Sequence, residues 1–300
     1  MEPTELYDDD KPVGRVLSRR EMITLLGGAG ASLIFGAAFT RIPLPQQTGT
    51  ATPAGTALPS CVVRPEQTEG PYFVDQQLNR FDLRVEPSDG SVKEGTLLHL
   101  IFNVTSIADN TCMPLQGAQV DVWHCDALGV YSGVDDPGFS TVDEKWLRGY
   151  QVTDENGVAE FLTIYPGWYS GRTVHIHFKI RTEPESEVGY EFTSQLFFPE
   201  DVTDEVHAQP PYNEKGYRNR LNANDGIFSD GGDQLTLDVA ETSEQAMADA
   251  LATAEATAEP QAGYQAIFNI GLDLTDASVG ASDSNGSGGG QGGGRPGSRP

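Results

Sequence analysis

Basic residues are scarce in this chain. Its 300 residues include 19 Lys and Arg against 44 Asp and Glu, which gives a formal net charge of −25. The few lysines are at positions 11, 93, 145, 179 and 215. This balance argues against a nucleic acid or an anionic membrane surface as partner, because both select for positive charge. Proteins from high-salt habitats are also acidic, and composition alone leaves that origin open.

Cysteine is rare as well, with three in the chain. This number fits an oxidising compartment, with one disulfide and one spare thiol. Cys61 and Cys112 lie in expected loops, whereas Cys125 lies on an expected strand. We therefore expect Cys61 and Cys112 to pair and Cys125 to be buried and free, although the sequence permits all three pairings.

No long, strongly apolar segment is present. The most apolar stretch, residues 22–40, is diluted by glycine and alanine and is barely long enough to span a bilayer. It follows Arg19 and Arg20, and paired arginines before a weak apolar run are typical of a twin-arginine export signal. We expect residues 1–42 to direct export to the periplasm, cell surface or exterior. Retention of this signal as a membrane anchor is left open.

Low-complexity segments flank one central region. Residues 43–60 form a Pro/Thr/Ala linker. Residues 276–300 contain nine glycines and almost no apolar side chain, which is typical of a disordered tail. The hydrophobic content suits one core of about 200 residues. We therefore expect a single folded domain over residues 61–275, and a homo-oligomer of it is also left open.

Short β-rich segments separated by turn signals fill this region. The expected strands are residues 96–104, 118–124, 149–153, 158–164, 174–181, 191–198, 234–239 and 264–274. Between the last two, residues 243–256 are rich in alanine and glutamate and favour a helix. The spacing predicts an all-β fold, a β-sandwich of mostly antiparallel strands with few short helices.

The segment from residue 164 to 180 has the densest grouping of reactive side chains. His175 and His177 are two residues apart in a run of β-branched and aromatic residues that predicts a strand. Because side chains alternate along a strand, both imidazoles point to one face, about 6–7 Å apart, where they can converge on a metal. An isolated His-x-His motif is about as often a solvent-exposed strand face as a metal site. The nearby Tyr169 and Arg172 favour a site.

Four segments in the same order resemble the intradiol ring-cleavage dioxygenases, non-haem ferric enzymes that open catechols between the two hydroxylated carbons. They are TEGPYF at 68–73, VDVWHCDALGVYSGV at 120–134, IYPGWYSGRTVHIHFKI at 164–180 and TSQLFF at 193–198. The resemblance covers roughly residues 61–274 and is closest to the protocatechuate 3,4-dioxygenase-like core and its exported branch. It implies one Fe(III) per chain, a catechol and O2 as substrates, and a muconate-type dicarboxylic acid as product.

The resemblance also implies a role for each matching residue. The iron ligands would be Tyr131, Tyr169, His175 and His177. The residues in contact with substrate would be Arg172 and Gln195, with Tyr72 and Phe197 in the pocket wall. Tyr169 would also act in catalysis, as the ligand that leaves the metal and accepts a proton. Gly171 stands where protocatechuate-cleaving relatives carry a bulky tryptophan. This difference argues against tight specificity for protocatechuate.

Ferric iron explains why tyrosine stands among these ligands. A phenol titrates near pH 10, so tyrosine ligates at neutral pH only where a strong Lewis acid replaces its proton. The arginine would stabilise the negative charge that develops on the ring, as a preorganised donor aimed at the transition state.

Two other interpretations stay open. His124 and Asp126, with His175 or His177, match the two-histidine, one-carboxylate triad of ferrous oxygenases, in which Arg181 would hold a 2-oxoacid. That hypothesis leaves both tyrosines unexplained. The other is a non-catalytic β-sandwich binding module, transthyretin-like or carbohydrate-binding, which would have kept the fold and lost the metal.

Overall fold

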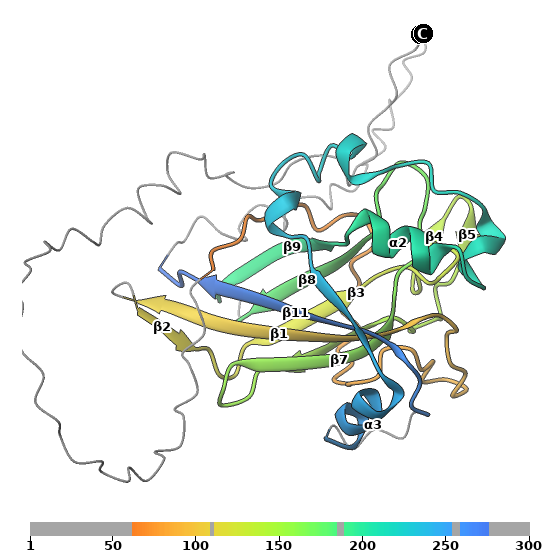
Figure 1. Cartoon of the computed structure of the whole chain (residues 1–300). Coiled ribbons are helices and arrows are strands. Elements are labelled where there is room, and N and C mark those ends of the chain that lie inside the picture. The colour runs from red at the N-terminus through yellow and green to blue at the C-terminus, as the bar shows by residue number, and fades with distance from the viewer. Residues whose placement is uncertain (1–61, 109–110, 185–188, 254–258, 276–300) are drawn as a thin grey trace, which may run out of the picture. The chain divides into compact units, whose positions relative to one another are not determined.

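The computed structural model describes residues 62–108, 111–184, 189–253 and 259–275 (Figure 1). The predicted export signal, linker and tail, and Cys61, lie outside the described residues. The strands are β1 (Leu97–Ala108), β2 (Thr111–Pro114), β3 (Gln119–Trp123), β4 (Asp135–Asp136), β5 (Phe139–Ser140), β6 (Arg148–Val152), β7 (Val158–Ile164), β8 (His175–Arg181), β9 (Glu191–Phe197), β10 (Asp238–Thr242) and β11 (Gly263–Leu272). The helices are α2 (Glu200–His207) and α3 (Glu244–Thr253), with short 3-10 turns at Tyr212–Lys215, Asn222–Asn224 and Gly232–Gln234.

The strands form two stacked sheets and one small hairpin. The first sheet has the order β10-β11-β1-β2, and β7 also pairs with β1. The second has the order β6-β3-β8-β9 and is antiparallel throughout. Figure 1 shows strands of both sheets running in similar directions, as in an aligned sandwich. The predicted β-sandwich is confirmed, and β1 with β11 is the one parallel pair among the strands described.

Phenylalanine rings from both sheets meet in the core between them. Phe178 of β8 lies 5.4 Å from Phe102 of β1 and 5.3 Å from Phe268 of β11, measured between ring centroids. Each fully buried side chain of this size contributes roughly 1.5–3 kcal/mol through removal from water. Ile176 and Ile180 point the same way as Phe178 and are fully buried. The odd-numbered residues of β8 therefore face away from this core, and the candidate site lies on that outer face.

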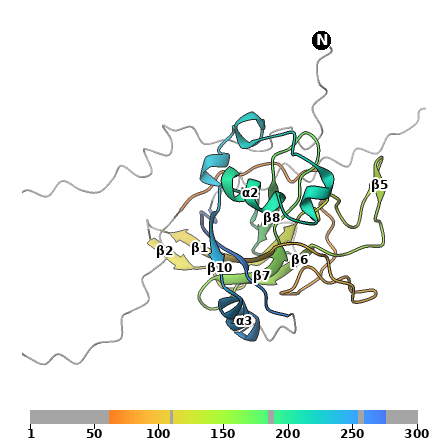
Figure 2. The ribbon, with the colours of Figure 1, turned by 45° about the vertical axis from the view of Figure 1, so that its right-hand side comes forward.

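Helices cover two opposite sides of the sandwich. Figures 1 and 2 show α3 beside β7 on one side and α2 with the segment after it on the other. Met247 and Leu251 of α3 pack on Leu97 and Leu162, which explains why the predicted helix forms there. Helix α2 was not predicted. Among the described residues no helix is long and apolar enough to cross a membrane.

One predicted strand is displaced along the chain. Residues 234–239 were expected to be a strand, but β10 begins at Asp238. A 3-10 turn occupies Gly232–Gln234, and Leu235 and Leu237 after it are buried in the core. The apolar residues that suggested a strand therefore reflect burial of an irregular segment.

The cysteines follow the expectation as far as the structure describes them. Cys112 on β2 is disulfide-bonded, and Cys125 is free and buried. Burial raises the pKa of the Cys125 thiol, with the charge of Asp126 adding to the effect, so this thiol is unreactive. The predicted partner of Cys112 lies outside the described residues, and the pairing stays a prediction.

Candidate metal centre and substrate pocket

The two histidines of β8 converge on one point. Their Nε2 atoms are 3.0 Å apart, and both rings are at most 2 % exposed. His175 Nδ1 lies 2.7 Å from the Thr173 carbonyl oxygen, so it carries the proton and leaves Nε2 free to ligate. His177 is held by stacking on Trp123, with ring centroids 5.1 Å apart and planes 9° apart. Strand register explains this contact, because Trp123 of β3 is paired with His177.

Both imidazoles are in the neutral form that metals require. Burial lowers the pKa of His175 well below its usual value, and the charge of Arg172 lowers it further. Burial likewise lowers the pKa of His177, with His175 adding to the effect. Neither ring has to lose a proton at neutral pH before it ligates a metal.

Two tyrosines complete the cluster. The Tyr169 hydroxyl is 3.1 Å from His175 Nε2. The Tyr131 ring lies 5.8 Å from the Tyr169 ring and 6.3 Å from the His177 ring, measured between centroids. The structure thus brings together the four residues predicted as iron ligands, three of them buried and Tyr169 partly exposed.

The spacing of these atoms fits a single metal ion. Two ligand atoms each about 2.1 Å from an ion and at right angles to one another are about 3 Å apart. The Nε2 to Nε2 distance of 3.0 Å and the hydroxyl to Nε2 distance of 3.1 Å both match that value. Two phenol oxygens and two imidazole nitrogens form a donor set suited to a hard, oxidised metal.

The tyrosines sit on two turns that pack against each other. The turn before Tyr131 is closed by Asp126, whose Oδ1 accepts the backbone N–H groups of Leu128 and Val130, each at 3.0 Å. Gly129 in this turn has φ +76°, and a Cβ there would lie 2.1 Å from the Trp168 carbonyl oxygen. A glycine is therefore required for the two turns to approach. Their contact fixes the separation of the two candidate ligands.

Arg172 is held in place by two fully buried partners. Its Nε donates to Asp225 Oδ2 at 2.9 Å, and its Nη2 donates to Gln195 Oε1 at 2.7 Å. Gln195 in turn donates from Nε2 to the Thr68 carbonyl oxygen at 3.0 Å. Asp225 is also fixed, because it accepts the backbone N–H of Thr173 at 2.8 Å. The guanidinium is thus oriented before any ligand arrives.

A second buried arginine lies beside Tyr131. Arg148 donates from Nη1 to the Tyr72 carbonyl oxygen at 3.1 Å and from Nε to Ser132 Oγ at 2.9 Å. Burial lowers the pKa of Arg148 to about 10, and the negative charge of an ionised Tyr131 opposes that shift. A cation in this position would favour the ionised form of Tyr131.

The sequence analysis missed both Asp225 and Arg148. Asp225, in Asn-Asp-Gly, has the local signature of an ordinary turn residue. Arg148 begins strand β6 with nothing nearby to mark it. Their roles come from tertiary contacts 53 and 17 residues away along the chain, to Arg172 and Tyr131.

A pocket of about 670 Å³ opens beside the cluster, a size typical of small-molecule sites. Tyr72, Tyr131, Tyr169 and Arg172 line it, together with the β4–β5 hairpin. The ring of Tyr72 stacks on Tyr131 with centroids 4.5 Å apart, so the predicted wall residue Tyr72 does face the pocket. Phe197 does not line it.

Phe197 instead supports the cluster from behind. It is fully buried, with its ring centroid 6.3 Å from that of His175 and 5.1 Å from that of Phe228. Its place in the register, opposite His175, puts it beside the strand of histidines rather than in the wall.

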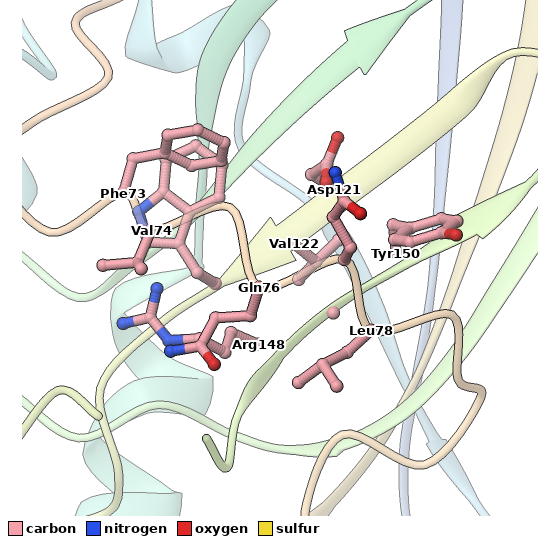
Figure 3. Close-up of a pocket in the computed structure, with 11 residues that line it drawn as sticks. Phe73, Val74, Gln76, Leu78, Asp121, Val122, Arg148 and Tyr150 are labelled. Carbon is pink, nitrogen blue, oxygen red and sulfur yellow. The ribbon is translucent and has the colours of Figure 1, made fainter. Parts of the chain in front are cut away.

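A second cavity is far smaller. Figure 3 shows it between Phe73, Asp121 and Arg148. Its volume is about 10 Å³, which holds about one water molecule. Of these two cavities, the tyrosine-lined pocket is therefore the one that accommodates an aromatic ring.

The residues of the ferrous triad are engaged elsewhere. His124 Nε2 is 2.7 Å from Thr163 Oγ1 of the other sheet, and its Nδ1 is 2.8 Å from the Cys125 carbonyl oxygen. Asp126 closes its own turn and accepts from Lys93 Nζ at 3.2 Å. Within the described residues, no three His, Cys, Asp or Glu side chains form a metal-binding group. The ferrous alternative is therefore wrong.

The arginine invoked by that alternative is also occupied. Arg181 donates from Nε and Nη2 to the two carboxylate oxygens of Asp121, and from Nη1 to Asp75 at 2.9 Å. These carboxylates neutralise the charge that a 2-oxoacid would need.

Comparison with known proteins gives a consistent family. A family model described as "Dioxygenase" matches residues 68–211. Chlorocatechol 1,2-dioxygenase from Pseudomonas putida is 30 % identical over 112 residues, which are 31 % of this chain and 40 % of that protein. The protocatechuate 3,4-dioxygenase beta chain from Burkholderia cepacia is 32 % identical over 120 residues, 37 % of this chain and 50 % of that one. The chain thus matches half or less of these two relatives.

A solved structure extends the likeness over the whole described domain. The intradiol ring-cleavage dioxygenase from Tetranychus urticae is 29 % identical, with a TM-score of 0.55, and the match covers 72 % of this chain and 96 % of that one. The fold and the family match agree with the four motifs in the sequence. In its motifs, in the family match over residues 68–211 and in its fold, the chain is similar to the intradiol ring-cleavage dioxygenases.

Proposed function

We propose that this protein is a non-haem Fe(III) dioxygenase that cleaves a catechol between its two hydroxylated carbons with O2. The observation that carries the proposal is the convergence of two neutral imidazoles and two phenols at the edge of a pocket that also holds a buried arginine. The family uses non-haem iron, and the fit of the donor atoms supports one ion per chain. A non-catalytic binding module would have no need of this full set.

Four residues would hold the iron, namely Tyr131, Tyr169, His175 and His177. When bound, a ferric ion would supply Lewis-acid chemistry that makes a ring carbon of the catechol reactive toward O2. The reaction balances without an external reductant. The bond between the hydroxylated carbons breaks, and one oxygen atom enters each new carboxyl group of the muconate-type product.

The residues of the chain have distinct tasks in this scheme. Tyr169, which is partly exposed on the pocket wall, accepts a proton from the incoming catechol and moves aside. Arg172 faces the same pocket and stabilises negative charge that grows on the ring, as a buried and oriented donor. Arg148, a cation beside Tyr131, would favour the ionised form of that ligand. Tyr72 and the rest of the wall orient the ring.

Loading with Fe(III) tests this function. The loaded protein should be wine-red, because phenolate-to-iron(III) charge transfer absorbs visible light, and it should consume O2 when catechol is added. His177→Ala is the control, which should bind no iron and stay colourless. A parent protein that binds Fe(III) and stays colourless, or that consumes no O2 with any catechol, would contradict the proposal.

We further propose export by the twin-arginine route, with residues 1–42 as signal, residues 43–60 as linker and residues 276–300 as tail. The support is the pair Arg19 and Arg20 before a weak apolar run. Replacing both arginines by lysine should trap the protein in the cytoplasm. Unchanged secretion of that double variant would show that the pair is not read as an address. Fractionation of the parent also decides between a cleaved signal and a retained membrane anchor.

A further inference from the structure

The wall of the pocket formed by the β4–β5 hairpin is acidic. Asp135 and Asp136 both line the pocket, with the apolar Val134, Pro137 and Phe139 beside them. Asp135 is exposed and Asp136 is half-buried. Figure 2 shows β5 projecting away from the two sheets, so this wall is the one farthest from the core.

One of these carboxylates is fixed close to the candidate metal centre. Asp136 Oδ2 accepts a hydrogen bond from the Tyr72 hydroxyl at 2.7 Å, and its Oδ1 accepts the Gly138 N–H at 2.8 Å. The Tyr72 ring in turn stacks on Tyr131. The carboxylate is therefore held one aromatic ring away from a candidate ligand, as part of the built wall.

Of the cations near the pocket, Arg148 is bonded to Ser132 and to the Tyr72 carbonyl oxygen behind the wall and does not line the pocket. Arg172 is the one cation among the described residues that line the pocket, and it is paired with the fully buried Asp225. Lys215, behind Gly129, donates to the Leu128 carbonyl oxygen and lies 5.1 Å from the Trp168 ring centroid. It is not part of the wall. The hairpin end is thus negative, and the net charge of −25 acts in the same direction.

We propose that this pocket selects catechols whose ring substituent carries no negative charge, and that Asp135 and Asp136 are the specificity-determining residues. The inference rests on the proposed function, because it is the hydroxyl end of a catechol that lies at Tyr131 and Tyr169. A substituent on the far side of the ring then points to the hairpin. A carboxylate there is repelled, an alkyl group meets Phe139, and an alkylammonium group is attracted.

A series of three catechols with short side chains of different charge tests the proposal. They are 4-ethylcatechol, 4-(2-aminoethyl)catechol and 3,4-dihydroxyphenylacetate, measured with Fe(III)-loaded protein as kcat/KM in air and as Kd without O2. We expect the aminoethyl compound to equal or exceed the ethyl compound. The acetate should be weaker than the ethyl compound by about tenfold or more, the size of a close charge repulsion in a partly hydrated pocket.

Matched variants locate the effect. Two variants are compared, Asp135→Asn and the double variant Asp135→Asn with Asp136→Asn. Each should raise the ratio of kcat/KM for the acetate to that for the ethyl compound by about three- to tenfold. Each should lower the corresponding ratio for the aminoethyl compound. Asp238→Asn on β10 makes the same change in net charge at an exposed position outside the pocket, and both ratios should stay at the parent values. The single variant at the exposed Asp135 remains decisive if the double variant, which alters the Tyr72 hydrogen bond, does not fold.

Two results would overturn the inference. One is a parent protein that treats the acetate as well as the ethyl compound, and the other is an Asp238→Asn variant that shifts the ratios as much as the hairpin variants do. Turnover of unsubstituted catechol tests the proposed function separately from the charge selection. If catechol is not turned over but the three anaerobic Kd values keep the expected order, the function fails and the charge selection stands. A reversed order of Kd values removes the charge selection whatever the turnover.

Discussion

Buried neighbours fix the position and orientation of Arg172 in the pocket wall. Its guanidinium is 1 % exposed and meets Asp225 and Gln195 behind the pocket wall. Its charge adds to the effect of burial, which lowers the pKa of His175. We expect a residue in this position, which lines the pocket, to act on the substrate rather than on metal binding.

Replacing this arginine by alanine should separate the two roles. Arg172→Ala should keep the iron and its colour, while kcat falls about 10²–10³-fold because an oriented donor to the transition state is lost. The affinity for substrate should change less than the rate, because the charge grows as the reaction proceeds. Iron content and single-turnover rates measure both. His175→Ala is the contrast and should lose the iron itself, and a colourless Arg172→Ala protein would refute this assignment.

The partner of the arginine can be tested in the same way. Asp225→Asn keeps the volume but leaves a buried guanidinium without its counter-charge, so we expect a loss of about 3 kcal/mol or more in the free energy of unfolding. Because the asparagine can still accept one hydrogen bond, iron binding should survive while kcat falls. Denaturation curves and rates for Asp225→Asn beside Asp230→Asn, an acid in the same loop outside these contacts, check both effects. Equal stability of the two variants would contradict the account.

The candidate ligands could be predicted from sequence because they lie in short motifs. His175 and His177 need only strand periodicity, and the two tyrosines come from segments that resemble one family. Asp225 and Arg148 could not be found in this way, because each acts across a long stretch of chain through a contact that only the packed fold creates. Phe197 was misplaced for a related reason. It lies on the same face of β9 as Gln195, but the sequence does not show that its ring packs beside His175 instead of reaching the pocket.

At the scale of elements, the site depends on two interlocked turns and on strand β8. The alternation of β8 buries Ile176, Phe178 and Ile180 in the sandwich and thereby presents both histidines on the opposite face. The turns that carry Tyr131 and Tyr169 meet at Gly129, with room for no side chain. The sheet fixes one half of the cluster and the turn contact fixes the other half.

Adding one methyl group to the turn should disturb the cluster. Gly129→Ala would place Cβ within 2.1 Å of the Trp168 carbonyl oxygen at a φ of +76°, which should destabilise the fold by about 1–3 kcal/mol and displace Tyr169. The visible spectrum of the Fe(III)-loaded variant should therefore shift. Gly117→Ala is the matched control, because Gly117 has φ +84° and nothing within 4 Å of an added Cβ. An identical spectrum for Gly129→Ala and the parent would show that the turns are not coupled.

The order of strands could be predicted only in part. Local alternation predicts strands, and regular turns predict a sandwich, but neither specifies which edges pair. The parallel pairing of β1 with β11 joins segments more than 150 residues apart and has no local signal. The strand predicted at residues 234–239 begins late because Leu235 and Leu237, which follow the 3-10 turn at Gly232–Gln234, are buried without being part of a ladder.

For the molecule as a whole, buried neutral histidines tie stability to pH. His124 is fully buried, and burial lowers its pKa to about 4. Its pKa in the unfolded chain is about 6.5, so between these values the unfolded state binds more protons and stability falls as pH falls. A difference of this size corresponds to about 3 kcal/mol, lost progressively between about pH 6.5 and pH 4.

Substitution of this histidine checks the sign. His124→Gln can still bond Thr163 and does not titrate, so its free energy of unfolding should depend less on pH over this range than that of the parent. Urea denaturation at pH 7 and pH 4.5 gives the comparison, and His207, which is only partly buried, provides His207→Gln as a control with a smaller effect. A parent protein that is more stable at pH 4.5 than at pH 7, relative to His124→Gln, would contradict the linkage.

The most direct test of the central claim is the fate of the two oxygen atoms. Fe(III)-loaded protein is supplied with catechol and ¹⁸O2, and the product is analysed by mass spectrometry. The account predicts a muconate that carries two labelled atoms, one in each carboxyl group, with no added reductant or 2-oxoacid. A product opened beside the hydroxylated carbons, a single label, or a requirement for a 2-oxoacid would contradict it.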